Sequence, residues 1–258
     1  MDAGKGFAPG RGARHGAARH GVARHGVARV ISKLGLASRT TAAAWVRAGR
    51  VQVNGRAVRD PEFPVRQGID RLSIDGEGAA HATRVVVMLN KPRGLVTTTR
   101  DEKGRATVYH CLGGSDLPWL APVGRLDKAS EGLLLFTNDP AWAARCNAPG
   151  SGADKTYHVQ VDQLPSAQWL RQVMAGVAVD GELLAAKSAR VLRSGVRHAW
   201  LEIVLDEGRN RHIRRLLEAC GVAVLRLVRV RVGSLRLGDL PKGQWRRLNA
   251  PEIAALGP

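Results

Sequence analysis

The chain has 258 residues, of which 44% are hydrophobic, so it is long enough for one or two domains with a proper core. Its 40 Lys and Arg outnumber its 22 Asp and Glu, and the net charge of +18 favours a polyanionic partner. No apolar run approaches the roughly 20 residues of a membrane-spanning helix, and no signal peptide is recognisable, so the sequence predicts a cytoplasmic protein.

Residues 1–29 carry an imperfect five-residue repeat with Arg-His-Gly and few large side chains, which predicts a disordered basic tail. His15, His20 and His25 recur at a fixed spacing, but Gly-rich surroundings would not preorganise a metal site. The tail arginines could touch RNA phosphates, and a solvated tail without function fits equally well. The three cysteines are dispersed and form no Cys-x-x-Cys pair, so we expect neither disulfides nor zinc.

Short amphipathic elements begin at Val30. Ser38 is placed to cap a second short helix that Gly49 ends, and Asn54-Gly55 supplies a type I′ turn between two alternating strands. Two short helices followed by this hairpin resemble the small RNA-binding domain first known from a ribosomal small-subunit protein, here over residues 30–76.

This resemblance implies that the second helix and the hairpin present basic residues to structured RNA. By position, the candidates are Lys33, Arg39, Arg47 and Arg50. An ordinary solvated helix face is the alternative, but the order of elements and the Asn-Gly turn favour contact with RNA phosphates.

Residues 77–84 are small and polar and predict a linker, after which an apolar strand from Val85 opens a second domain of residues 85–258. Alternating strands follow, together with three helices, near residues 140–147, 166–174 and 210–220. No strand, glycine loop and helix signature of a nucleotide-binding fold is present. We therefore expect an α+β fold with a mixed, largely antiparallel sheet flanked by helices.

One carboxylate in this domain has an unusual setting. Asp127 lies in a polar turn before the apolar run Leu133 to Phe136, which predicts a strand buried on both faces. Glu131-Gly132 is expected to lie just before that strand and to mark its start. Taken alone, such a turn is more often simply solvated.

Four segments together resemble the RsuA family of pseudouridine synthases, which modify ribosomal RNA. They are residues 90–94 (Asn-Lys-Pro-Arg-Gly), 124–139 around Asp127, 154–159 and 207–215. The resemblance runs from about residue 30 to the C-terminus. It implies isomerisation of a specific uridine to pseudouridine in ribosomal RNA by base flipping and aspartate-dependent cleavage and re-formation of the glycosidic bond, with no cofactor and no metal.

The same motifs imply roles for individual side chains. Asp127 is the catalytic carboxylate, either attacking the sugar or base or assisting a glycal route, and the sequence leaves both open. Tyr157 corresponds to the aromatic platform for the flipped uracil, although a core aromatic is the alternative. Arg214 corresponds to the cationic partner of Asp127. His212 stands where the family commonly has Gln.

The resemblance also implies a positive cleft that binds the RNA substrate. Arg125 is placed to fill the gap left by the flipped base or to bind a phosphate. The full set of expected substrate contacts is Arg125, Lys155, Lys91, Arg93, Arg209 and Arg211.

The alternatives belong to two other classes of function. A catalytically silent RNA-binding or ribosome-assembly protein could be built on the same fold. A DNA-binding regulator would need a recognition helix and usually a dimerisation surface, and neither is recognisable. Because no exposed apolar stripe is apparent, we expect a monomer.

Overall fold

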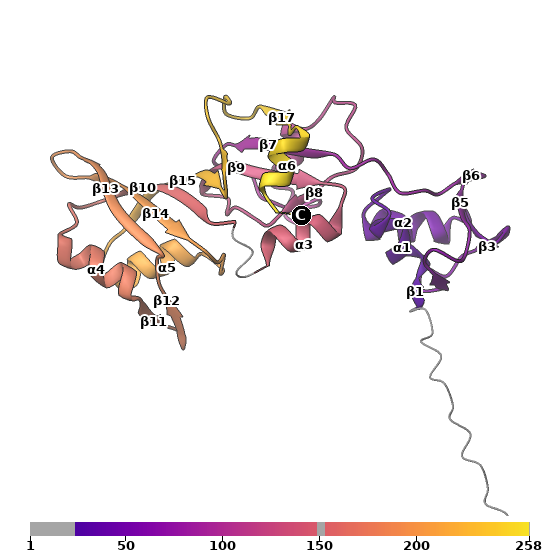
Figure 1. Ribbon diagram of the computed structural model, residues 1–258, viewed down its shortest axis with the longest axis horizontal. Coiled ribbons are helices and arrows are strands. Elements are labelled where there is room, and N and C mark those ends of the chain that lie inside the picture. The colour runs from indigo at the N-terminus through magenta and orange to yellow at the C-terminus, as the bar shows by residue number, and fades with distance from the viewer. Residues whose placement is uncertain (1–23, 149–152, 258) are drawn as a thin grey trace, which may run out of the picture.

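The computed structural model describes residues 24–148 and 153–257, which form a small N-terminal domain and a larger second domain (Figure 1). The elements of the small domain are β1 (Arg24–Gly26), α1 (Val27–Lys33), α2 (Arg39–Arg47), β2 (Val51–Val53), β3 (Arg56–Val58), β4 (Pro64–Arg66), β5 (Leu72–Ile74) and β6 (Glu77–Gly78). The strands β3-β2-β5-β6 form one sheet, and β1 pairs with β4. Ile31, Val46 and Val51 join the helices and the sheet in one apolar core.

The capping and turn signals of this domain are confirmed. The Ser38 hydroxyl accepts a hydrogen bond from the Thr41 N–H at 2.9 Å, as an N-cap residue does. Gly49, just beyond α2, has a φ of +75°. Asn54 and Gly55 have φ values of +51° and +81°, the left-handed conformations that a type I′ turn requires.

Both predicted boundaries of the small domain are wrong by a few residues. Residues 24–29, expected in the tail, form β1 and the start of α1, and Val27 is fully buried. Glu77 and Gly78, expected in the linker, pair with β5 as β6. The strands β1 and β6 are ordered by backbone pairing, which leaves little trace in side-chain composition, whereas Val27 is held by its burial in the apolar core. The rest of the tail, with His15 and His20, lies outside the described residues.

The larger domain is built on a nine-stranded sheet in the order β13-β14-β10-β15-β9-β7-β17, with β8 beside β9 and β16 beside β15. Its elements are β7 (Val86–Lys91), the 3₁₀ helix η1 (Val108–Cys111), β8 (Ala121–Val123), β9 (Ser130–Thr137), α3 (Pro140–Asn147), β10 (Lys155–Val161), α4 (Ala167–Ala175), β11 (Val177–Val179), β12 (Glu182–Leu184), β13 (Ser188–Ser194), β14 (Ala199–Leu205), α5 (His212–Ala219), β15 (Val224–Val232), β16 (Leu235–Arg236), β17 (Trp245–Arg247) and α6 (Ala250–Ala255). Only the pairing of β15 with β9 is parallel among the described strands, so the predicted mixed, largely antiparallel sheet is confirmed. Among the described residues, no helix combines the length and the apolar composition needed to cross a bilayer.

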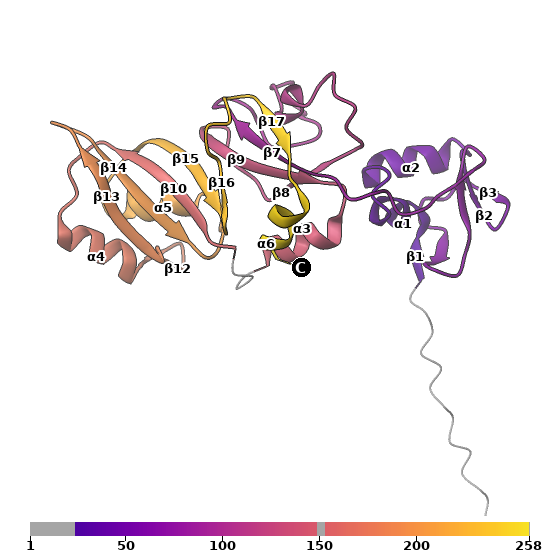
Figure 2. The same ribbon diagram turned by 45° about the horizontal axis from the view of Figure 1, so that its top comes forward.

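Strand β9 lies inside this sheet, between β15 and β7, and is buried along its whole length, as its apolar run predicted. Leu134 faces one core, which extends to α4 and α5, while Leu133 faces a second core that contains Trp142 of α3. Figures 1 and 2 show α3 and α6 beside β9, and α4 and α5 beside β10 and β14. The loop that carries Asp127 is therefore attached to a strand that is packed on both faces.

Gly132 is part of β9 and does not precede the strand, contrary to the prediction from the sequence. The strand begins at Ser130, and Gly132 has a φ of +99° where it pairs with Arg229 of β15. A Cβ atom at Gly132 would lie 2.2 Å from the carbonyl oxygen of Arg229. Glycine is required because the two parallel backbones approach each other closely at this point.

We therefore expect Gly132→Ala to lower the free energy of unfolding by about 3 kcal/mol or more, because it combines a backbone clash with a left-handed φ. Urea denaturation followed by circular dichroism measures the loss. Gly181→Ala is the matched control, since Gly181 has a φ of +79° but no atom within 4 Å of its Cβ position. A similar loss in both variants would contradict this account of Gly132.

Candidate active site

Asp127 lies in the short loop between β8 and β9. The loop closes on itself through the Ser130 N–H, which donates to the Asp127 carbonyl oxygen at 2.9 Å. Leu126 is 6% exposed and anchors the loop in the core, and its carbonyl oxygen accepts from the Thr97 hydroxyl at 2.7 Å. These hydrogen bonds and the burial of Leu126 fix the backbone on either side of Asp127. The partly exposed Asp127 side chain therefore starts from a fixed position.

Lys91 supports this loop from inside the protein. Its side chain is fully buried, and its ammonium group donates to the carbonyl oxygens of Pro92 at 3.1 Å, Asp127 at 3.2 Å and Ser130 at 2.7 Å. Burial lowers the pKa of Lys91 to about 8, although Glu131 and Asp127 act in the opposite direction. The prediction that Lys91 lines the substrate cleft is therefore wrong. The sequence motif could not show that the charge of Lys91 points into the protein, toward backbone carbonyl oxygens.

A cavity of about 340 Å³ opens beside Asp127, within the roughly 300–1,000 Å³ common for small-ligand sites. It brings together side chains from three regions that are far apart in the sequence. Of the predicted site residues, those that line it are Arg125, Asp127, Lys155, Tyr157, Arg209 and Arg211. Lys91, Arg93 and Arg214 are not among its lining residues.

Tyr157 forms part of the cavity wall from β10. It is 8% exposed and pairs in register with Ile203 of β14 and Arg229 of β15. The ring also belongs to the apolar core. The two interpretations of this residue, core aromatic and platform for a base, are therefore compatible, because one side of a ring in a cavity wall can pack while the other remains accessible.

Arg214 holds the backbone of the Asp127 loop and forms no ion pair in the described part of the chain. Its guanidinium donates to the carbonyl oxygens of Ala129 at 3.3 Å and Val224 at 3.2 Å, and its Nε is buried without a partner. Burial and the neighbouring Arg211 lower the pKa of Arg214, whereas Asp127 raises it. The guanidinium is thus within electrostatic reach of Asp127 but is not bonded to its carboxylate.

Arg229 is a functional candidate that sequence reasoning missed. It is 6% exposed, lines the cavity, and its Nε donates to the Leu133 carbonyl oxygen at 2.7 Å. The pKa of Lys155 is lowered mainly by its own burial and further by the charge of Arg229. The available signal was its place in β15, where Arg229 falls two residues after the buried Leu227 and so shares the buried face of the strand.

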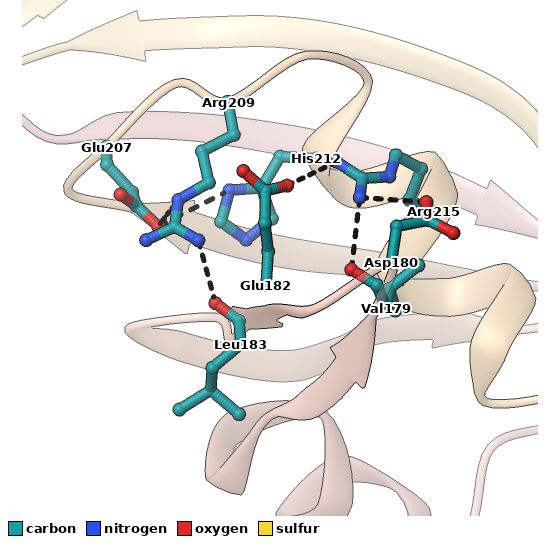
Figure 3. Close-up of polar contacts among 8 residues, drawn as sticks. All are labelled: Val179, Asp180, Glu182, Leu183, Glu207, Arg209, His212 and Arg215. Carbon is teal, nitrogen blue, oxygen red and sulfur yellow. Dashed lines mark hydrogen bonds and ion pairs between the residues drawn. The ribbon is translucent and has the colours of Figure 1, made fainter.

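The segment before α5 brings Arg209 and Arg211 to the cavity, and the β11–β12 hairpin holds it in place (Figure 3). Arg209 pairs with Glu207 at 2.8 Å and donates to the Leu183 carbonyl oxygen at 3.1 Å. Arg215 binds the opposite end of the hairpin, through Val179, Asp180 and Glu182. These ion pairs are structural, because they fix the segment that carries the cavity residues.

His212 occupies the position where a glutamine was expected from the family motif. It is 3% exposed, lies at hydrogen-bonding distance from the Ala185 carbonyl oxygen at 3.0 Å through Nε2, and its Nδ1 lies 3.9 Å from Glu207. Burial lowers its pKa, which favours a neutral ring that donates from Nε2. Among the described residues, no cluster of His, Cys, Asp or Glu is arranged to hold a metal ion.

The predicted RNA-contacting residues of the small domain differ in whether their charges already have a partner. Arg50 is bound to Asp75, with its Nε 3.0 Å from Oδ1, and it lies over the Trp45 ring. Arg39 makes a solvent-exposed ion pair with Glu62 at 3.3 Å. Lys33 lies 3.4 Å from His25. Arg47 is exposed, with no ion-pair partner among the described residues.

We expect Lys91→Met to lower the free energy of unfolding by about 2 kcal/mol, because three buried carbonyl oxygens lose their donor while the side-chain volume is kept. Thermal unfolding measures this change, and Lys103→Met, at an exposed loop position, is the control. Equal stability of both variants would contradict the supporting role of Lys91.

The sequence was compared with protein families and with known proteins. The RNA pseudouridylate synthase family profile matches residues 85–219, and the S4 domain profile matches residues 27–68. A ribosomal large subunit pseudouridine synthase B of Bacillus subtilis is 33% identical over 231 residues, covering 88% of this chain and 93% of that protein. An uncharacterized RNA pseudouridine synthase of Aquifex aeolicus is 34% identical over 230 residues, covering 88% of this chain and 92% of that protein.

A solved crystal structure of a pseudouridylate synthase covers 91% of this chain and 99% of its own, at 28% identity and a TM-score of 0.62. Its likeness extends over both domains, as do the two sequence matches. The motif resemblance and the fold expected from it are therefore confirmed. The chain belongs to the RNA pseudouridine synthase family, with an N-terminal S4 domain, as in the RsuA type.

Proposed function

We propose that this protein isomerises a specific uridine to pseudouridine in ribosomal RNA, and in the large subunit in particular. The observation that carries the proposal is the cavity in which one carboxylate, Asp127, meets the Tyr157 ring and several cations. Two similar proteins, from Bacillus subtilis and Pseudomonas aeruginosa, are named as large-subunit synthases, which supports the choice of subunit.

The reaction requires that the bond from the ribose to the uracil nitrogen breaks, that the base turns, and that ring carbon 5 joins the same ribose carbon. Carbon 5 loses its proton and the freed ring nitrogen gains one, so the overall change is an isomerisation. We assign Asp127 as the carboxylate beside the ribose, since it is anchored by its backbone while its side chain remains at the cavity. Either covalent attack by this carboxylate or stabilisation of a glycal route fits the geometry. Both routes balance without an oxidant, a reductant or a metal.

We assign Tyr157 as the surface on which the flipped uracil lies, because an aromatic wall offers stacking to any pyrimidine. Arg229 and Arg214 supply positive charge around the carboxylate, each held by backbone carbonyl oxygens. Arg125, Arg209, Arg211 and Lys155 are proposed to bind the phosphates of the extruded nucleotide. Flipping costs a few kcal/mol, which these contacts offset.

We further propose that the enzyme acts as a cytoplasmic monomer and that the S4 domain binds a neighbouring part of the same RNA. Arg93 is exposed and outside the cavity, so we assign it to the RNA backbone beyond the target nucleotide. Arg47 and Arg39 are the S4 residues best placed for phosphate contact, because both are exposed on α2.

Chemical mapping of pseudouridine in ribosomal RNA tests the enzymatic proposal in cells that lack the gene and are complemented with variants. We expect one site to disappear in the deletion strain and to return with wild type and with Asp116→Asn, an exposed control carboxylate. It should not return with Asp127→Asn. Identical maps in all strains would refute the proposal, and RNA binding without any modified site would favour a catalytically silent RNA-binding protein.

We expect Arg39→Glu/Arg47→Glu to weaken binding to a ribosomal RNA transcript by roughly tenfold near physiological salt and to flatten the salt dependence, because each phosphate contact releases about one counterion. Filter binding at several salt concentrations measures both effects. Arg171→Glu/Arg236→Glu changes the net charge equally at exposed positions outside the S4 domain. If both double variants bind alike, the assignment of α2 to RNA fails.

A further inference from the structure

The strands β13, β14, β10 and β15 have a second face that no helix of the described chain covers. Val159 and Leu201 point into the core with α4 and α5. The residues that alternate with them, His158, Gln160 and Trp200, are partly exposed on the opposite face. In Figure 1, α4 and α5 lie together on one side of these strands. The uncovered face is distinct from the active-site cavity. Lys155 and Tyr157, the residues of β10 that line the cavity, alternate with His158 and Gln160 and therefore lie on the opposite face of the sheet.

Trp200 is at the centre of a basic cluster on this face, the outer-face patch, which we define as Arg193, Arg197, His198, Trp200 and Arg226. The guanidinium carbons of Arg193 and Arg226 lie 5.2 Å and 5.8 Å from the centroid of the Trp200 indole ring. Arg193 comes from β13 and Arg226 from β15, on either side of Trp200 on β14. A cation–π contact orients a guanidinium without neutralising its charge.

Two hollows flank this pair of side chains. One, of about 470 Å³, is lined by Gln160, Trp200 and the turn from Arg193 to His198. The other, of about 350 Å³, includes His158, Arg193, Trp200 and Arg226. Both are therefore bordered by Arg193 and Trp200, and both are open to a ligand that follows the sheet surface.

Among the described arginines of the patch, Arg226 is paired with the carboxylate of Glu131, whereas the charges of Arg193 and Arg197 are not balanced by carboxylates. Glu131 is occupied by Arg226 and Lys242, with closest contacts of 2.7 Å. Glu202 is occupied by Arg190 at 2.7 Å and also lies 3.7 Å from His158. Within residues 24–148 and 153–257, Arg193 and Arg197 have no ion-pair partner, and both are exposed.

We propose that the outer-face patch binds the phosphate backbone of an RNA segment that lies outside the active site. Guanidinium groups suit phosphate because they donate two parallel hydrogen bonds to it, and a pre-oriented guanidinium loses less freedom on binding. The proposal rests on the proposed function, since a ribosomal RNA substrate is large enough to reach both faces of one sheet. An RNA segment bound there adds affinity and holds the enzyme on its substrate, while the chemistry takes place on the other face.

The test measures binding and activity separately, with single charge reversals. Arg193→Glu and Arg197→Glu are each compared with Arg171→Glu, an exposed α4 position on the covered side of the sheet. Binding to an in vitro transcript of large-subunit ribosomal RNA is measured at several salt concentrations. Activity is measured by pseudouridine formation in a short stem–loop that contains the target uridine and is too small to reach the patch.

We expect each patch variant to bind the long transcript roughly three- to tenfold more weakly than Arg171→Glu and to lower the salt slope by about one. Turnover of the short stem–loop should equal that of wild type. Arg193→Gln/Arg197→Gln removes charge without reversing it and should give the same binding loss, which excludes an effect of misfolding or of new repulsion alone.

Unchanged affinity and salt slope in the patch variants would overturn the proposal, as would binding of an acidic protein, not RNA, to this face. The proposed function fails in a different way, since the wild-type protein would then form no pseudouridine in either RNA.

Discussion

The buried ammonium group of Lys91 is the interaction on which the active-site geometry depends. It joins the end of β7, the loop that carries Asp127 and the first residue of β9 by donating to three backbone carbonyl oxygens. A lysine has three N–H donors and no acceptor, so it can satisfy three carbonyl oxygens of an irregular loop that lacks sheet partners. Because this support comes from inside the protein, the cavity side of Asp127 remains free for a substrate.

Two arginines bound to the backbone of the Asp127 loop and of β9 follow a related principle. Arg229 and Arg214 are held mainly by backbone carbonyl oxygens, and in the described part of the chain neither has a carboxylate partner at ion-pair distance. A carbonyl oxygen fixes a guanidinium without cancelling its charge, so the site keeps a positive potential for an anionic substrate. Arg209 and Arg215, in contrast, are paired with carboxylates. Arg215 attaches α5 to the β11–β12 hairpin through Asp180 and Glu182, and Arg209, paired with Glu207, contacts the same hairpin through the Leu183 carbonyl oxygen.

The sheet uses the two-residue period of its strands to separate two surfaces. On β10, Lys155 and Tyr157 line the cavity, whereas His158 and Gln160 lie on the outer face with Trp200. A single backbone can therefore carry the proposed active site on one side and the proposed RNA contact on the other. This arrangement requires that β9 and β15 stay in register, which the missing side chain at Gly132 permits.

Local chemistry was enough to predict the caps, the hairpin turn, the buried strand after Asp127 and the class of fold, because each depends on neighbouring residues. The motifs likewise identified Asp127, Tyr157 and most of the cavity cations. The tertiary structure alone decided the inward direction of Lys91, the attachment of Arg214 to the loop backbone and the place of Arg229 in the cavity. Each of these depends on carbonyl groups contributed by segments distant in the sequence, and no local pattern records which backbone a long cationic side chain will meet.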